Sequence, residues 1–134
     1  MSRAFSEHER ALLLRLVSGA RDEEALRAQV EVSEYGEAWF EGSQSFTIVP
    51  GRSVTSPNRG RGRGPTPGPQ ALVLKDGAKP VSEENFVGAV LLWLDGDRIT
   101  ALEYWWVTDE MPDRLPRLEQ LIDGSVAGES ISDL

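Results

Sequence analysis

Two apolar runs separated by an Asp-Gly pair dominate the pattern of hydrophobic positions in this chain of 134 residues. Together they form residues 86–107, FVGAVLLWLDGDRITALEYWWV, which contain three of the four tryptophans. Asp95-Gly96 suits the positive φ angles of a two-residue type I′ turn, so the runs are predicted to pair as an antiparallel hairpin. Because both faces of this hairpin are largely apolar, we expect it to be central in a larger sheet, with other elements covering it.

The register of the hairpin decides which side chains share a face. With the two-residue loop, one face carries Leu92 with Glu103 and Trp105, and the opposite face carries Leu102 and Tyr104. A three-residue loop with a bulge at its glycine would exchange the two faces, because side chains alternate at every residue of a strand. The sequence leaves both registers open.

Two helices are predicted before the sheet. Ser6 and Glu9 have the spacing of a capping box, which predicts a helix over residues 7–18 that stops at Gly19. The apolar positions of this helix give a broad stripe that is suited to burial. A second, shorter helix is predicted for residues 22–29, with an aspartate as its N-cap.

After residue 29 the hydrophobic period changes from helical to two. Residues 30–41 have the alternation of a half-solvated strand pair, and residues 45–49 and 72–74 are two further strands. Pro116 suits the first turn of a final short helix. The pattern therefore predicts an α+β fold: an N-terminal helix pair packed on a mostly antiparallel sheet of about five or six strands, with a central C-terminal hairpin and a short C-terminal helix.

Composition divides the chain into one domain, one internal loop and a tail. Residues 1–122 are predicted to form a single α+β domain, and residues 123–134 a flexible tail. Residues 51–70 are rich in arginine, glycine and proline and are predicted to form a mobile loop. The Arg-Gly repeats at 59–63 are compatible with a nucleic-acid tether, but a flexible connection is favoured because the repeats are few and lack interleaved aromatic residues.

The net charge of −8 changes the set of plausible partners. It argues against nucleic-acid binding by the domain and against an anionic membrane surface, although the loop at 51–70 is locally basic. The N-terminal segment lacks the pattern of a secretion signal, and no run approaches the length of a membrane span, so we expect a cytoplasmic protein.

The chain offers few groups for catalysis. It has no cysteine, and its single histidine, His8, lies at a predicted helix start, so a catalytic triad or a multi-histidine metal site is not expected. Asp109 and Glu110 are adjacent carboxylates, but no calcium-loop spacing surrounds them and a solvated turn is favoured. We therefore expect no catalytic residues, no metal, no cofactor and no enzymatic activity.

Glu103 stands out because it lies inside the most apolar run, where an unpaired carboxylate is costly. One interpretation is a carboxylate with a raised pKa in an apolar pocket, in a small-ligand-binding or catalytic domain. The favoured interpretation is structural: the residue lies at a sheet end or pairs with an arginine, for example Arg98.

Adjacent tryptophans and nearby carboxylates suggest a surface for a protein partner. Trp105 and Trp106 must point to opposite faces of their strand. An exposed Trp106 beside Asp109, Glu110 and Asp113 would suit a basic partner, since tryptophans often supply much of the energy at protein interfaces. The favoured alternative is that both indoles are buried.

The segment Val90–Tyr104 resembles the "LLxVxDGRLSxLEY" hairpin of small actinobacterial proteins of uncharacterised function, some of which resemble immunity proteins of polymorphic toxin systems. The similarity covers a small part of the chain and concerns a folding motif. It implies an α+β fold and a non-enzymatic role, and it carries over no site residues. A small acidic binding protein, such as an immunity protein or antitoxin that blocks a basic toxin site, is therefore the function we expect. The Glu103 pocket remains the alternative.

Overall fold

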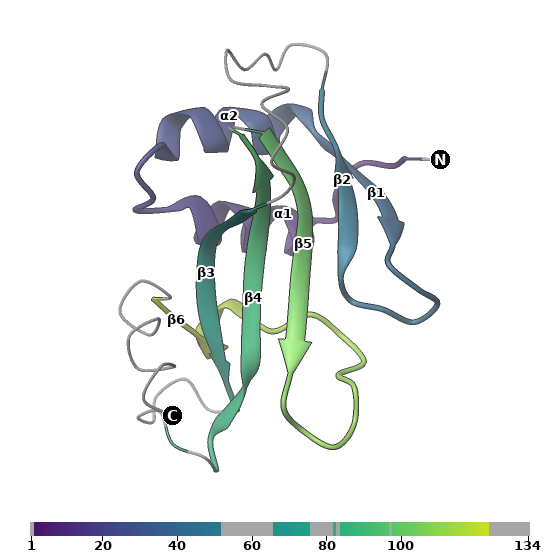
Figure 1. Cartoon of the computed structure of the whole chain (residues 1–134), viewed down its shortest axis with the longest axis vertical. Helices are drawn as coiled ribbons and strands as arrows, with labels where there is room; N and C mark the ends of the chain where they lie inside the picture. Colours follow the sequence, from purple (N-terminus) through teal and green to yellow (C-terminus); the bar gives the residue numbers. More distant parts are fainter. Residues whose placement is uncertain (1, 52–65, 76–81, 83, 97, 124–134) are drawn as a thin grey trace.

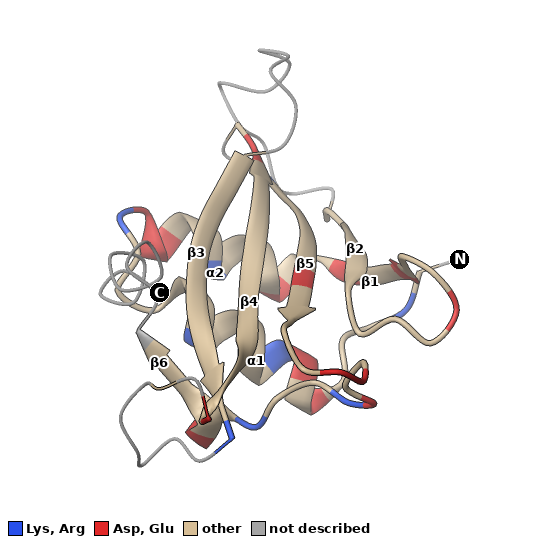
Figure 2. Cartoon of the chain, turned by 60° about the horizontal axis from the view of Figure 1, so that its bottom comes forward, with Lys and Arg blue, Asp and Glu red and all other residues tan. Residues whose placement is uncertain are grey.

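The computed structural model describes residues 2–51, 66–75, 82, 84–96 and 98–123. Within these residues, two α-helices precede six strands that form one antiparallel sheet (Figure 1). The strand order is β1-β2-β5-β4-β3-β6, and both helices lie on the same side of the sheet (Figures 1 and 2). The predicted α+β fold is therefore confirmed, with the hairpin strands at the centre.

The elements, in chain order, are α1 (Glu7–Val17), α2 (Glu23–Val32), β1 (Glu34–Ala38), β2 (Phe46–Val49), β3 (Thr66–Leu74), β4 (Phe86–Asp95), β5 (Arg98–Trp106), the 3-10 turn η1 (Leu118–Gln120) and β6 (Leu121–Asp123).

The start and end of α1 follow local chemistry, whereas the predicted N-cap of α2, Asp22, makes no side-chain cap hydrogen bond. The Ser6 hydroxyl accepts a hydrogen bond from the Glu9 amide at 3.1 Å, and the Glu9 carboxylate accepts one from the Ser6 amide at 2.8 Å, so the predicted capping box is present. Gly19, after the end of α1, has a φ of +83°, which glycine adopts without strain. Helix α2 runs three residues past its predicted end because buried Leu26 and Val30 continue the helical spacing. Residues 30–41 therefore contain the end of α2 and a single strand, not a strand pair.

The predicted hairpin forms, but a bulge shifts its register. Leu94 pairs with Ile99 whereas Trp93 pairs with Ala101, so Thr100 is an extra residue in β5. Beyond this bulge every side chain of β5 lies on the face opposite to the one that the two-residue loop alone predicts.

Leu102 and Tyr104 consequently face the helices, and Glu103 and Trp105 face away. The alternative assignment of faces that the sequence left open is therefore correct for most of β5, but its cause is the bulge at Thr100 and not one at Gly96. Asp95, which the prediction placed in the loop, is the last residue of β4 and pairs with Arg98. Next to the bulge, the buried Gln29 side chain of α2 accepts a hydrogen bond from the Ile99 amide at 3.0 Å. This bond ties the helix layer to the shifted register.

The hydrophobic core lies between the helix pair and the sheet. Its fully buried side chains include Leu12, Leu13 and Val17 from α1 and Phe46, Leu92 and Leu102 from the strands. Each such side chain contributes roughly 1.5–3 kcal/mol by leaving water. The central hairpin therefore supplies a large part of the stability, as its composition predicts.

Strand β3 begins inside the stretch that composition assigns to the loop at 51–70. Residues 66–70 are strand, and residues 52–65 lie outside the described part of the chain. Two prolines are tolerated here because β6 pairs only with residues 71–73 and the β3–β4 register shifts between Pro67 and Gln70.

The end of the described chain also differs from the prediction. In place of a final helix, residues 118–120 form the 3-10 turn and residues 121–123 pair with β3 as an edge strand. Leu121 packs into the core, whereas Ile122 packs on the other side of the sheet. Asp123, which the prediction placed in the tail, is the last residue of β6, and the rest of the predicted tail, residues 124–134, lies outside the described residues.

At the opposite edge of the sheet, Arg3 pairs with Tyr35 of β1. The Arg3 amide donates to the Tyr35 carbonyl at 3.0 Å, and the Tyr35 amide donates to the Arg3 carbonyl at 2.8 Å. The Arg3 guanidinium lies 3.9 Å from the Tyr35 ring centroid and forms an ion pair with Glu9 at 2.8 Å.

Candidate functional site

The sheet face turned away from α1 and α2, which we call the open face, is largely apolar. Strand register and packing place on it Leu72, Ala89, Leu91, Trp93, Ala101, Glu103 and Trp105. No helix in the described part of the chain lies on this face (Figures 1 and 2). The expectation that other elements cover both faces of the hairpin is therefore met on the helix side only, as far as the described residues extend.

One end of the open face is packed by its own side chains. Phe86 and Trp105 meet edge to face, with ring centroids 5.9 Å apart and an angle of 67°. With Ile122 they cover Leu72 and Ala89, which are completely buried. Trp105 is therefore committed largely to packing within the chain.

The other end of the open face contains a hollow between two indoles. Trp39 and Trp93 line it together with Thr100 and Ala101, and its volume is about 350 Å³. The walls are almost entirely apolar, and Trp39 keeps 43% of its surface exposed. Because Trp39 follows β1 and Trp93 lies in β4, the hollow forms only when the sheet is assembled. An open cavity between two tryptophans is a feature typical of a binding surface.

A carboxylate lies beside this hollow. Glu103 is two residues after Ala101 on the same face, and its side chain accepts a hydrogen bond from the Trp93 indole N–H at 2.9 Å. The residue is partly exposed, so it is not enclosed in an apolar pocket. The sequence suggested Arg98 as a partner; in the structure the partner is an indole, and Arg98 pairs in register with Asp95.

The predicted partner-binding residues are only partly brought together. Asp109, Glu110 and Asp113 are exposed in the loop that follows β5 (Figure 2). Asp113 lies 3.7 Å from the guanidinium of Arg114, so the loop carries both signs of charge. Trp106 lies opposite Gly88 on the helix-facing side and is partly buried, so it does not share the open face with the hollow.

Sequence reasoning missed Trp39 and Trp93 as a pair. The two residues are 54 positions apart, and no sequence pattern links β1 to β4. A signal was present, however: Trp39 interrupts a set of polar residues on the solvated side of its segment, and an exposed large aromatic side chain is a common mark of an interface.

The remaining polar candidates have structural explanations. A ring nitrogen of His8 lies 2.8 Å from the Pro116 carbonyl oxygen, which joins the start of α1 to the segment before η1. Among the described residues, no three histidine or acidic side chains gather as they would around a metal ion. In the same residues, no helix is both long and apolar enough to cross a bilayer.

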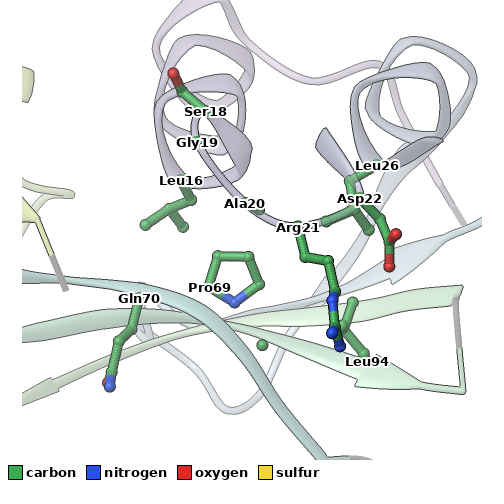
Figure 3. Close-up of a pocket in the computed structure, with 11 residues that line it drawn as sticks. Leu16, Ser18, Gly19, Ala20, Arg21, Asp22, Leu26, Pro69, Gln70 and Leu94 are labelled. Atoms are coloured by element: carbon green, nitrogen blue, oxygen red, sulfur yellow. The ribbon is translucent and has the colours of Figure 1, made fainter. Parts of the chain in front are cut away.

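A second cavity lies between the α1–α2 turn and strands β3 and β4 (Figure 3). Its volume is about 440 Å³, and its apolar walls include Leu16, Leu26 and Leu94. Arg21 reaches from the helix turn toward the sheet, whereas Gln70 points away to the other side of the sheet (Figure 3). Among the described residues that line it, exposed Arg21 and Asp22 are the only charged side chains, so these residues do not form a convergent set of polar groups.

No protein-family model, curated protein or solved structure matches this chain. The resemblance of the hairpin to that of immunity proteins therefore stays a prediction.

Proposed function

We propose that this chain is a small acidic protein-binding module that holds a basic partner on its open face. The partner class that we propose is a toxin with a basic nucleic-acid or nucleotide site, for which the chain serves as immunity protein or antitoxin. The observation that carries the proposal is the hollow between Trp39 and Trp93 on the apolar open face.

Two further features support this proposal. Partly exposed tryptophans around a cavity are well suited to anchor a protein partner, because rigid aromatic groups bury much area at little entropic cost. The net charge of −8 attracts a basic partner from a distance, and the exposed carboxylates Asp109 and Glu110 contribute to that field. Trp39 and Trp93 therefore replace Trp106 as the proposed anchors.

If the proposal is correct, charged residues should determine the association rate and the tryptophans the dissociation rate. We would measure binding kinetics between this chain and the product of the adjoining gene, the first candidate partner, at low and high salt. Reversing Asp109 and Glu110 to lysine should mainly slow association, because these exposed charges act during approach. Trp39→Ala should mainly speed dissociation, because it removes an anchor from the bound state.

Trp106→Phe is the matched control, since that ring lies on the helix-facing side. Its binding kinetics should equal those of the natural chain once both are shown to be folded. Kinetics that do not depend on salt and are unaffected by both the charge reversal and Trp39→Ala would contradict the proposal.

A further inference from the structure

The hollow on the open face has the chemistry of a site for one particular side chain. Its walls are indoles, its other lining residues are small, and the carboxylate of Glu103 is hydrogen-bonded to the indole of Trp93 at 2.9 Å. We propose that this hollow receives an arginine side chain of the protein partner, stacked against Trp93 and Trp39 with its guanidinium directed to Glu103. This inference rests on the proposed function, because it specifies what the partner inserts at that site.

The aromatic walls favour a cation. The face of an indole carries negative potential, and tryptophan is the best of the aromatic side chains for binding a cation in this way. The Trp93 N–H donates to an anion, which polarises the indole and makes its face more negative. A neutral aromatic or aliphatic group would also fill the hollow but would gain nothing from Glu103.

The shape and the apolar walls favour arginine over a small cation or lysine. A guanidinium is planar, stacks on aromatic rings and is less strongly hydrated than an ammonium group. Its three-carbon stem can lie against Ala101 while the charged end remains at the open mouth, beside the partly exposed Glu103. Arg98 is the nearest arginine of the same strand, but it pairs in register with Asp95 at the turn and does not line the hollow.

Short peptides test this without the partner. The probes are an acetylated, amidated Gly-Arg-Gly peptide and the same peptide with citrulline, which has nearly the same shape without the charge, or with lysine. Binding is followed by the shifts of the assigned indole N–H signals of the full chain in NMR titrations at low salt. The arginine peptide should bind in the millimolar range and shift the signals of Trp39 and Trp93. The citrulline peptide should bind at least several-fold more weakly, with the lysine peptide in between.

Variants locate the site. Trp39→Ala should weaken binding of the arginine peptide about two- to thirty-fold, the range expected for the loss of one cation–aromatic contact. Glu103→Gln should weaken it about two- to five-fold, as expected for the loss of one partly exposed charge contact. Phe40→Ala removes the neighbouring exposed ring, which does not line the hollow, and Glu119→Gln removes an exposed carboxylate of η1; both should bind the peptide as the natural chain does.

Two results would overturn the inference: equal binding of the arginine and citrulline peptides, or shifts that are unchanged by Trp39→Ala and Glu103→Gln. Its failure is distinguishable from failure of the proposed function. A partner that binds through the open face while the peptides show no preference for arginine refutes only the inference. A hollow that prefers arginine, in a chain whose open-face variants bind the partner normally, refutes the proposed function.

Discussion

The indole N–H of Trp93 in β4 donates a hydrogen bond of 2.9 Å to the carboxylate of Glu103 in β5. The register places Glu103 opposite Leu91, so the bond runs diagonally across the open face. It satisfies a carboxylate inside an apolar strand and fixes the orientation of one wall of the hollow. The two residues should therefore be energetically coupled.

A double-mutant cycle with Trp93→Phe and Glu103→Gln measures this coupling. We expect an interaction free energy of about 1 kcal/mol from urea unfolding, typical of a partly exposed hydrogen bond to a charged group. The same cycle with Trp105→Phe in place of Trp93→Phe should give a value near zero, because the Trp105 ring packs against Phe86. Additive effects in the first cycle would show that the bond contributes no stability.

The bulge at Thr100 predicts which side chains of the hairpin are essential. Leu92→Ala and Leu102→Ala should each lower the free energy of unfolding by about 2–5 kcal/mol, since both side chains are fully buried under the helices. Glu103→Ala, one residue along, should cost much less because that side chain is partly exposed. If Leu102→Ala cost under about 1 kcal/mol in urea titrations, the shifted register would be wrong.

The Arg3–Glu9 ion pair predicts a loss of stability in acid. Burial tends to raise the pKa of Glu9, but hydrogen bonds from Arg3 and Ser6 outweigh it and hold the pKa below the usual value of 4.5. A carboxyl group with a lowered pKa stabilises the fold above its unfolded pKa and loses that contribution as the pH falls through the folded pKa. Stability should therefore drop below about pH 4.5.

Glu9→Gln should flatten that dependence in thermal melts recorded across the acid range. Glu7→Gln is the matched control, because Glu7 is exposed in the same first turn of α1. A Glu9→Gln variant that retains the full acid dependence would mean that other carboxyl groups cause it.

The burial of Tyr104 leads to a prediction for alkaline pH. Burial raises the pKa of its phenol to about 12 from the usual value of 10.0. A group with a raised pKa stabilises the fold below its unfolded pKa, and that contribution is lost as the pH rises through the folded pKa. The fold should therefore weaken between pH 10.0 and about 12. Tyr104→Phe should reduce this alkaline loss in denaturant titrations, and an unchanged loss would mean that other groups cause it.

The close approach of β5 to Gly88 makes glycine necessary at this position of β4. A Cβ atom at this position would collide with the carbonyl oxygen of Trp105 and approach the Cα of Trp106, both backbone atoms that cannot rotate away. Gly88→Ala should cost about 3 kcal/mol or more in urea unfolding, at or above the upper end of the usual range for overpacking, because the backbone has to shift. A Cβ atom at Gly19 would have no atom within 4 Å. Gly19→Ala should therefore lower the free energy of unfolding by about 1–2 kcal/mol, from the positive φ alone. A cost at Gly88 no larger than that at Gly19 would contradict the close strand contact.

Local sequence signals predicted the helices and strands better than the register and packing of these elements against one another. The capping box at Ser6 and the Asp-Gly turn signal act over a few residues, so the start of α1 and the presence of the central hairpin were readable from the sequence, although Asp95 belongs to β4 and not to the loop. The bulge at Thr100 was not, because it is stabilised by contacts such as that between Gln29 and Ile99, which are 70 positions apart. The prolines of β3 led to the prediction that residues 66–70 belong to a loop, but proline is acceptable in a strand where one side of the strand lacks a partner.

The residues of the candidate site are brought together by the bulge and by the strand order, which the sequence did not predict. Which side of the sheet carries Glu103 and Trp105 follows from the bulge, and the approach of Trp39 to Trp93 follows from the strand order β1-β2-β5-β4. The exposed carboxylates at 109, 110 and 113 were predictable from local polarity alone.

The pairing of Arg3 with Tyr35 has a consequence for self-association. The outermost strand of a sheet offers free amide and carbonyl groups that can recruit a strand of another molecule and start fibril growth. At Tyr35 the backbone of Arg3 already occupies these groups, and its charged side chain covers the ring beside them. The segment before α1 therefore protects this edge of the sheet and discourages copies of the chain from pairing through β1. The tryptophan hollow then remains available for a partner of a different kind.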